Sequence, residues 1–270
     1  MSIAFIGAGN MAGSLVNGLI ESGTSPSEIA AADPIAKQLE KLSVLGVVTA
    51  ANNDQAIKAV DVIVLAVKPQ VIGQVLEALS GLTPNQLIIS IVAGIDLRSL
   101  ETWLPANQPI VRCMPNTPAL LGAGMTGLFA NSRVTDQQKA LATHILEAVG
   151  EVAWVSKEAH LDAVTAVSGS GPAYFFLLME NMIAAGQKLG LDAELSKKLT
   201  EQTAFGAALM AQKSNVDPGT LRKNVTSPGG TTEAALNLML AQDFPATVID
   251  ALSAAEKRAK ELAVEFGAKS

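Results

Sequence analysis

The run GAGNMAG at 7–13 is the first segment of the chain whose residue types could bind a ligand. It follows an apolar run at 2–6, opens an amphipathic stretch and matches the dinucleotide fingerprint G-x-G-x-x-G/A. Gly7 allows the tight turn, Gly9 lets the backbone approach a pyrophosphate, and Ala12 or Gly13 lets the helix pack closely on the strand. The helix start offers free N–H groups to the anion. We predict a nicotinamide dinucleotide site here; a glycine turn without a ligand is the alternative.

Asp33 ends the second apolar run, EIAAAD at 28–33, and Pro34 follows it. A carboxylate at this place accepts hydrogen bonds from both ribose hydroxyls of NAD and repels the 2′-phosphate of NADP. Asp33 alone therefore favours NADH. Aspartate also commonly begins a turn and a helix, and Lys37 one turn further on could offset a phosphate. The choice between NADH and NADPH is left open by these residues.

Two further loops follow strand-like runs, at the edge of a parallel sheet where ligands bind. In AVKPQ at 66–70, Lys68 could face the phosphates or the ribose of the cofactor, or it could be a solvated residue at a helix start. The loop MPNTP at 114–118 comes after the run PIVRCM and is stiffened by two prolines. We expect this second loop to lie beside the nicotinamide ring.

The segment NVTSPGGTT at 224–232 is the second candidate for ligand binding, and the helical pattern EAALNLMLA follows it. Two glycines, a proline and four hydroxyl residues before a helix form a backbone nest whose N–H groups can surround an anion such as a carboxylate. Hydrogen bonds to a charged group contribute ~1.5–3 kcal/mol each, so a few of them could hold a small acid without an arginine. The alternative is an ordinary capped helix start, which needs only one Ser or Thr.

Strong acids and bases do not fall in recognisable catalytic settings. The two histidines, His144 and His160, belong to no such motif, Cys113 has no evident base partner, and no cluster has the spacing of metal ligands. Such a site suits an imine that arrives protonated, because the iminium charge itself draws a hydride, whereas an alcohol dehydrogenase needs a proton acceptor. We predict a reductase for a small, carboxylate-bearing imine, without a metal.

The elements that must position these segments change character near residue 157. Before about residue 155, short β-branched runs alternate with amphipathic stretches, as in a parallel sheet covered on both faces. After it, Ala- and Leu-rich helical patterns cover about 159–190, 192–213 and 244–266, with a shorter helix from near Thr231. We predict an α/β N-terminal Rossmann-type doubly wound sheet for the dinucleotide at 1–157 and an all-α C-terminal substrate and dimerisation domain at 158–270.

The helical half is apolar over more than one face, most clearly between Tyr174 and Ile183. A helix that is apolar all round must be covered on all sides, so we predict a dimer that exchanges helices. The run SGSGPAY at 168–174 stands where the two halves meet. We interpret it as an interdomain hinge, with a role in lining the cleft as the alternative.

Composition limits the partners and the compartment. A chain of 270 residues that is 49% hydrophobic can bury a sizeable core, and a formal charge of −6 with scattered basic residues argues against nucleic acid and membrane surfaces. The most apolar helical stretch, 172–191, is interrupted by polar residues and does not predict a membrane span. The single cysteine excludes an intrachain disulfide, and the N-terminus lacks a signal-peptide pattern. We expect a cytoplasmic protein.

Taken together and in order, the motifs GAGNMAG, AVKPQ, RCMPNTP, SGSGPAY and NVTSPGGTTEAAL resemble those of pyrroline-5-carboxylate reductases over nearly the whole chain. The last motif is the family's signature. The resemblance implies reduction of 1-pyrroline-5-carboxylate to L-proline with NADPH or NADH, as the last step of proline synthesis. It also implies a homodimer built from the helical domain, often assembled further into a homodecamer.

The resemblance also implies roles for individual residues. The substrate carboxylate lies against the nest, and Thr232, the catalytic residue, has its hydroxyl near the ring nitrogen as a donor or orienter. The substrate-binding residues are Ser227, Gly229, Gly230, Thr231 and Thr232. For the cofactor it implies Gly7, Ala8, Gly9, Asn10, Met11, Asn53, Ala66, Lys68 and Asn224, and to these we add Asp33, Pro69 and Asn116 from the strand ends and loops described above. Asp33 departs from the family, because many relatives carry a small polar or basic residue there, and this puts their usual preference for NADPH in doubt.

Two other functions stay open at the level of the sequence. A 3-hydroxy acid dehydrogenase of the same two-domain plan would use a lysine of the helical half as its proton shuttle, and Lys188, Lys197 and Lys198 are available on polar helix faces. A non-enzymatic sensor could bind a nicotinamide nucleotide through the same glycine loop, although a sensor needs no second anion site.

Overall fold

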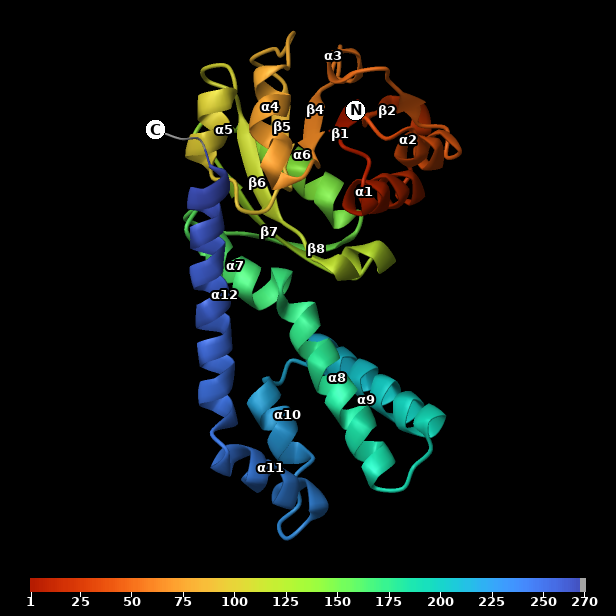
Figure 1. The fold of residues 1–270 in the computed structure, drawn as a ribbon, viewed down its shortest axis with the longest axis vertical. Coiled ribbons are helices and arrows are strands. Elements are labelled where there is room, and N and C mark those ends of the chain that lie inside the picture. The colour runs from red at the N-terminus through yellow and green to blue at the C-terminus, as the bar shows by residue number, and fades with distance from the viewer. Residues whose placement is uncertain (268–270) are drawn as a thin grey trace. The chain divides into compact units, whose positions relative to one another are not determined.

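The computed structural model describes residues 1–267, which form two compact units (Figure 1). The first unit comprises residues 1–170 together with the chain from Ala254 onward, and the second comprises Gly171–Ser253. The second unit is therefore an insertion whose two ends both connect to the first. The functional division at residues 157 and 158 stays a prediction.

The first unit alternates strands and helices along the chain. Its elements are β1 (Ile3–Ile6), α1 (Asn10–Glu21), η1 (Pro26–Glu28), β2 (Ile29–Ala32), α2 (Ala36–Ser43), β3 (Val48–Thr49), α3 (Asn53–Ala56), β4 (Val62–Leu65), η2 (Pro69–Val71), α4 (Ile72–Glu77), β5 (Leu87–Ser90), α5 (Leu97–Trp103), β6 (Ile110–Met114), η3 (Thr117–Leu121), β7 (Gly124–Ala130), α6 (Asp136–Glu147), β8 (Gly150–Trp154), α7 (His160–Val164) and the π-helical turn η4 (Thr165–Gly169).

The strands form one eight-stranded sheet in the order β3-β2-β1-β4-β5-β6-β7-β8. Strands β1 to β6 are parallel, β7 runs antiparallel to β6, and β8 is parallel to β7. The first six follow the strand order of doubly wound dinucleotide-binding sheets, in which the order of the strands reverses at a switch point between β1 and β4. The predicted fold class is confirmed. Strands β3, β7 and β8 were not predicted, because β3 has only two residues, β7 is broken by glycines, and β8 is largely exposed.

Two apolar layers explain why the strands are buried on both faces. On one face α1, α2 and α6 contribute Leu15, Leu42 and Ile145 to a core shared with Phe5 of β1. On the other face α3, α4 and α5 pack against the alternate residues of the same strands, such as Ile63. Successive side chains of a strand point to opposite faces, so near-continuous apolar runs become buried on both sides. This covering fixes the carboxyl edge of the sheet as its accessible side.

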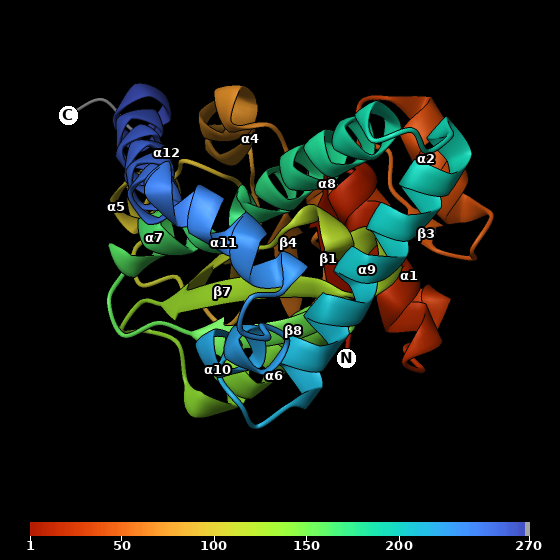
Figure 2. The same cartoon turned by 90° about the horizontal axis from the view of Figure 1, so that it is seen from below.

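The second unit is helical. Its elements are α8 (Gly171–Lys188), α9 (Ala193–Lys213), α10 (Pro218–Asn224), α11 (Thr231–Ala241) and the first part of α12 (Phe244–Phe266), which continues into the first unit. Helices α8 and α9 lie side by side (Figure 1, Figure 2), and a Cβ built at Gly186 would come within 2.9 Å of the Ser196 hydroxyl oxygen. No helix within residues 1–267 is long and apolar enough to span a bilayer.

Exposed apolar side chains gather on the helices of the second unit. Phe175 and Phe176 of α8, Phe205 and Met210 of α9, and Leu238 of α11 are each more than half exposed. Clustered exposed apolar side chains of this kind are typical of an interaction surface. The prediction that these helices are apolar over more than one face is confirmed.

Candidate active site

The glycine loop between β1 and α1 is built to leave room for a ligand. Gly7 has φ of 95°, and its N–H donates to the Ala32 carbonyl at 2.9 Å; a Cβ there would lie 2.6 Å from the Ala66 carbonyl oxygen. Gly9 is the N-cap of α1 without a side-chain hydrogen bond, and a Cβ at Gly9 would meet nothing within 4 Å. The N–H groups at this helix start and the open space beside Gly9 fit a pyrophosphate.

Close packing of α1 depends on residues other than Gly13. Ala12 is fully buried, whereas a Cβ at Gly13 would meet nothing within 4 Å. Of the two alternatives in the sequence, Ala12 is therefore the residue that faces the sheet. Further along α1, a Cβ at Gly18 would come within 2.2 Å of the Ala148 carbonyl oxygen, so this glycine permits the approach to the chain after α6.

Asp33 ties the end of β2 to the glycine loop. Its Oδ2 accepts the Ala8 N–H at 2.7 Å, and its Oδ1 accepts the Ile35 N–H at 2.8 Å. Asp33 therefore does stabilise the turn after β2, as the alternative interpretation of this residue predicted. The carboxylate also lies at the carboxyl edge of the sheet, where each oxygen retains a lone pair for a ribose hydroxyl. Asn53, the first residue of α3, follows β3 at the same edge.

An apolar hollow of about 330 Å³ lies on the other side of the switch point. It is formed at the carboxyl ends of β4, β5 and β6 and beside the start of α1. Its lining residues are Met11, Ala66, Val67, Lys68, Pro69, Ile91, Ala93, Met114 and Pro115. The predicted residues Met11, Ala66, Lys68 and Pro69 are therefore brought together. Ile91 and Ala93 were missed, although their place just after the buried run LIIS could have indicated them.

Asn116 has a local structural task. Its Oδ1 accepts the Met125 N–H at 2.9 Å, and its Nδ2 donates to the carbonyl oxygen of Ser168 at 3.2 Å and to the Ser168 hydroxyl at 3.3 Å. The amide therefore joins the loop after β6 to β7 and to the π-helical turn. Contact of Asn116 with the cofactor stays a prediction. The boundary between the two units lies two residues after Ser168, at Ser170. It falls within the run SGSGPAY at 168–174, which was interpreted as an interdomain hinge.

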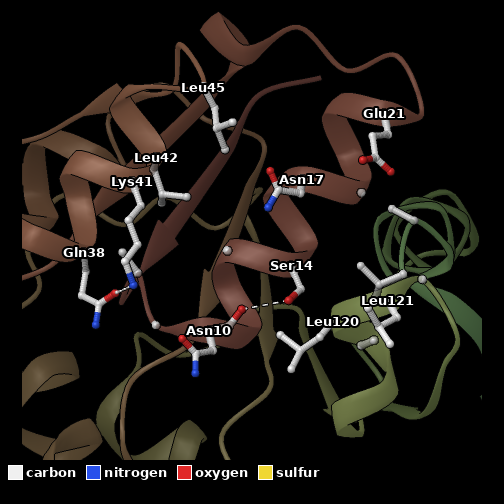
Figure 3. Close-up of a pocket in the computed structure, with 18 residues that line it drawn as sticks. Asn10, Ser14, Asn17, Glu21, Gln38, Lys41, Leu42, Leu45, Leu120 and Leu121 are labelled. Atoms are coloured by element: carbon white, nitrogen blue, oxygen red, sulfur yellow. Dashed lines mark hydrogen bonds between the residues drawn. The ribbon is translucent and has the colours of Figure 1, made fainter.

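A second hollow, of about 690 Å³, runs along the outer side of α1 between α2 and η3 (Figure 3). Asn10, Ser14 and Asn17 of α1 line it from one side, and Leu120 and Leu121 of η3 are exposed at its rim. It includes the outer side of the glycine loop but none of the residues at the ends of β4, β5 and β6. The prediction that the loop at 114–118 lies beside the nicotinamide ring concerns the smaller hollow, which Met114 and Pro115 line.

The predicted substrate segment of the second unit forms a turn followed by a helix start. The Gly230 N–H donates to the Ser227 carbonyl at 3.0 Å, Gly229 has φ of 72°, and Gly230 is the N-cap of α11 without a side-chain bond. Ser227, Thr231 and Thr232 are exposed here, so their hydroxyls face open space. Asn224, predicted to contact the cofactor, is the exposed last residue of α10. Within this unit, the nest has the free donors that an anion requires.

Strand β6, whose end lines the hollow, carries two ionisable side chains, Arg112 and Cys113. Burial raises the pKa of the Cys113 thiol well above its ordinary value, with Arg112 acting in the opposite direction. Arg112 pairs with Glu158, which also accepts the Leu97 N–H at 2.6 Å, so both side chains are engaged in the framework. Residues 1–267 contain no group of three His, Cys, Asp or Glu residues that could hold a metal ion.

The accessible glycine loop, the carboxylate at the end of β2 and the apolar hollow across the switch point have the arrangement that a nicotinamide dinucleotide needs. The fold and the site therefore define a nicotinamide-dependent oxidoreductase.

Comparison with known proteins narrows this class. Residues 158–262 match the family model for pyrroline-5-carboxylate reductase dimerisation, and residues 2–94 match that for coenzyme F420-dependent NADP oxidoreductases. The chain is 53% identical to a pyrroline-5-carboxylate reductase of Pseudomonas aeruginosa over 98% of both chains, and 43% identical to one of Haemophilus influenzae. A solved reductase of Coxiella burnetii aligns with a TM-score of 0.92 at 45% identity, covering 97% of this chain and 98% of that one. A Plasmodium falciparum pyrroline carboxylate reductase with NADP bound aligns with a TM-score of 0.85 at 32% identity, covering 97% of this chain and 98% of that one.

The chain belongs to the pyrroline-5-carboxylate reductase family. The resemblance found in the sequence motifs is thereby confirmed, over nearly the full length of this chain and of its relatives. Membership sets aside the 3-hydroxy acid dehydrogenase and the nucleotide sensor as alternatives. The hypothesis of a dehydrogenase depended on three lysines of the helical half, and all three are exposed: Lys188, Lys197 and Lys198.

Proposed function

We infer that this chain is an NAD(P)H-dependent enzyme that reduces 1-pyrroline-5-carboxylate to L-proline, the final step of proline biosynthesis. The observation that carries this conclusion is its 53% identity to the Pseudomonas aeruginosa reductase across 98% of both chains. The geometry agrees with it, because the first unit offers a dinucleotide site and the second offers a nest for a small carboxylate. Reduction of a protonated imine needs no strong acid or base.

On the cofactor side, we propose that the glycine loop, Asp33 and the apolar hollow hold NAD(P)H. The open space at Gly9 and the N–H groups at the start of α1 support a pyrophosphate there. Met11, Ala66 and Pro69 would contact the nicotinamide, with Lys68 at the exposed rim of the same hollow. When bound, the reduced nicotinamide supplies the hydride. The residues of this chain fix its position and exclude water on the apolar side.

On the substrate side, we propose that the turn and helix start at 227–232 bind the substrate carboxylate. The backbone N–H groups of Thr231 and Thr232 are among the first of α11, which have no acceptor within the helix. The protonated imine nitrogen donates a hydrogen bond to the Thr232 hydroxyl oxygen, which holds the ring in place. Hydride adds to the carbon of the C=N bond, the electron pair of that bond passes to nitrogen, and the iminium charge is neutralised. Positioning thus contributes most of the rate.

Asp33 leads us to propose NADH as the preferred cofactor. Its carboxylate lies at the end of β2, and its two oxygens face the glycine loop and the following turn. A negative charge at this place accepts ribose hydroxyls and repels a 2′-phosphate. Measurement of both nucleotides with the same substrate tests this preference.

We propose further that the chain forms a homodimer through its second unit and assembles into a homodecamer. The exposed apolar side chains of α8, α9 and α11 and the match to a dimerisation model support association. We also propose a cytoplasmic location, since the single cysteine, which is buried, asks for no oxidising compartment. The functional division between residues 157 and 158 is proposed on the change from strands to helices.

The assignment of the nest to the substrate carboxylate can be tested by removing that carboxylate. We expect 1-pyrroline, which keeps the ring and the C=N bond, to have a KM at least about a hundredfold above that of 1-pyrroline-5-carboxylate, because several charge-assisted hydrogen bonds are lost. The KM for the nucleotide should not change. Equal KM values for the two imines would show that the carboxylate is bound weakly or not at all.

A further inference from the structure

The turn that begins the nest is held by the side chain of Glu233, the residue that follows Thr232. The Gly229 N–H donates to Oε2 of Glu233 at 2.8 Å. Glu233 is the third residue of α11, and it reaches back past the N-cap residue, Gly230, to the residue before it. An acidic residue at this place resembles half of a capping box, and it also suits the helix dipole.

This hydrogen bond fixes one peptide plane. Residues 227–230 have the features of a type II β-turn, with Pro228 second, Gly229 third at φ of 72°, and a bond from the Gly230 N–H to the Ser227 carbonyl. Type I and type II turns differ by a flip of the central peptide, which here joins Pro228 to Gly229. Because Glu233 accepts the N–H of that peptide, it favours one of the two orientations.

The remaining donors of the nest are thereby limited. The Gly229 N–H is taken by Glu233, and the Gly230 N–H is taken by Ser227. The N–H groups of Thr231 and Thr232 lie at the helix start and have no acceptor within the helix. A carboxylate with two oxygens can use these two groups without displacing Glu233.

We propose that Glu233 is a positioning residue for the substrate carboxylate. It holds the turn so that the N–H groups of Thr231 and Thr232 and the neighbouring hydroxyls converge before the substrate arrives. Preorganisation of this kind increases affinity because less conformational freedom is lost on binding. The proposal rests on the proposed function, since the nest is taken as the site of the substrate carboxylate.

The test compares two substitutions in the full-length enzyme. Glu233→Ala removes the acceptor, and we expect the KM for 1-pyrroline-5-carboxylate to rise roughly three- to tenfold, as for loss of a helix-start hydrogen bond, while kcat and the nucleotide KM stay within about twofold. Glu233→Gln keeps an acceptor oxygen and removes a charge that repels the substrate. Its KM should equal that of the wild type or fall below it. Glu194→Ala, in the first turn of α9, is the matched control.

A second measurement reports on the turn independently of turnover. Amide hydrogen exchange of the segment 226–233, followed by mass spectrometry, should be faster in Glu233→Ala than in the wild type and near the wild-type rate in Glu233→Gln. Thermal melting of both variants checks that the fold is retained.

Several outcomes would overturn the proposal. An unchanged KM in Glu233→Ala would remove the positioning role, and a lowered KM would mean that Glu233 obstructs the substrate. If Glu233→Gln raised the KM as much as Glu233→Ala, the effect would come from the lost charge and not from the lost hydrogen-bond acceptor. Unchanged exchange in Glu233→Ala would refute the hold on the turn, even if the wild type did not reduce 1-pyrroline-5-carboxylate. Failure of the wild type to reduce 1-pyrroline-5-carboxylate would instead refute the proposed function.

Discussion

Substitution of the three glycines of the loop by alanine should separate the requirements of the fold from those of the cofactor. Gly7→Ala places a side chain at φ of 95° and a Cβ 2.6 Å from the Ala66 carbonyl oxygen. A left-handed backbone costs about 1–2 kcal/mol, and strain from the backbone contact adds to it, so we expect a loss of roughly 2–4 kcal/mol in the free energy of unfolding. That is a large part of the ~5–15 kcal/mol by which domains are stable.

Gly9→Ala should have the opposite effects, with stability unchanged and nucleotide binding weakened. Gly9 has φ of −70°, and an added Cβ meets nothing within 4 Å, so the free energy of unfolding should change by less than about 0.5 kcal/mol. The methyl group occupies the space through which the pyrophosphate approaches the backbone, so the KM for NAD(P)H should rise about tenfold or more. Gly13→Ala lies inside α1 with open space around it and should stabilise the helix by about 0.5–1 kcal/mol with unchanged kinetics.

Denaturant unfolding and steady-state kinetics on the three variants make the comparison. The reasoning would be refuted if Gly9→Ala unfolded as easily as Gly7→Ala, because its Cβ would then meet a contact that the structure does not show. It would equally fail if Gly9→Ala bound NAD(P)H as the wild type does, since the loop would then not be the pyrophosphate site.

The remaining predictions concern three other side chains. In Asp33→Ser the shorter side chain cannot bridge the N–H groups of Ala8 and Ile35, so the KM for NADH should rise. Loss of the negative charge should also move the ratio of kcat/KM values toward NADPH. Parallel losses for both nucleotides would contradict the role of Asp33 in cofactor selection. Thr232→Ala should lower kcat by about tenfold with the nucleotide KM unchanged, and Thr232→Ser should recover most of it; full activity in the alanine variant would remove Thr232 from the mechanism. Burial raises the pKa of the Cys113 thiol above its ordinary value of 9.0, so the native chain should resist iodoacetamide and the unfolded chain should react. As the pH rises through 9.0, the Cys113 thiol loses its proton in the unfolded chain and keeps it in the folded chain. The free energy of unfolding should therefore be retained in full below that pH and fall above it. Cys113→Ala should reduce this fall.

Local sequence predicted the elements whose conformation depends on nearby residues. The glycine fingerprint follows β1 as expected, since the positive φ of Gly7 and the open helix start are properties of a few adjacent residues. The apolar runs became buried parallel strands because each is flanked by helices that cover both faces. Asp33 lies at the end of β2 as expected, but its bond to Ala8 joins residues 25 positions apart and could not be foreseen from either motif.

The parts that the sequence did not predict depend on distant pairing. Strand β7, with two glycines in seven residues, is held by its pairing with β6 and β8. The structural contacts of Asn116 were not predicted either, because its amide bonds to Ser168, 52 residues further along the chain, as well as to Met125. The insertion of the second unit into the first also follows from packing alone, since Ala259 and Leu262 of α12 belong to the first unit and line a hollow there with Val92. Helical periodicity does not reveal which unit a helix end joins.

The central claim is that this chain reduces 1-pyrroline-5-carboxylate with a nicotinamide nucleotide. The most direct test follows the absorbance of NADH and NADPH in the presence of purified enzyme and 1-pyrroline-5-carboxylate, and identifies the product by mass spectrometry. We expect oxidation of the nucleotide that depends on the imine, with one L-proline formed for each nucleotide consumed. Absence of oxidation with either nucleotide, from enzyme shown to be folded, would contradict it.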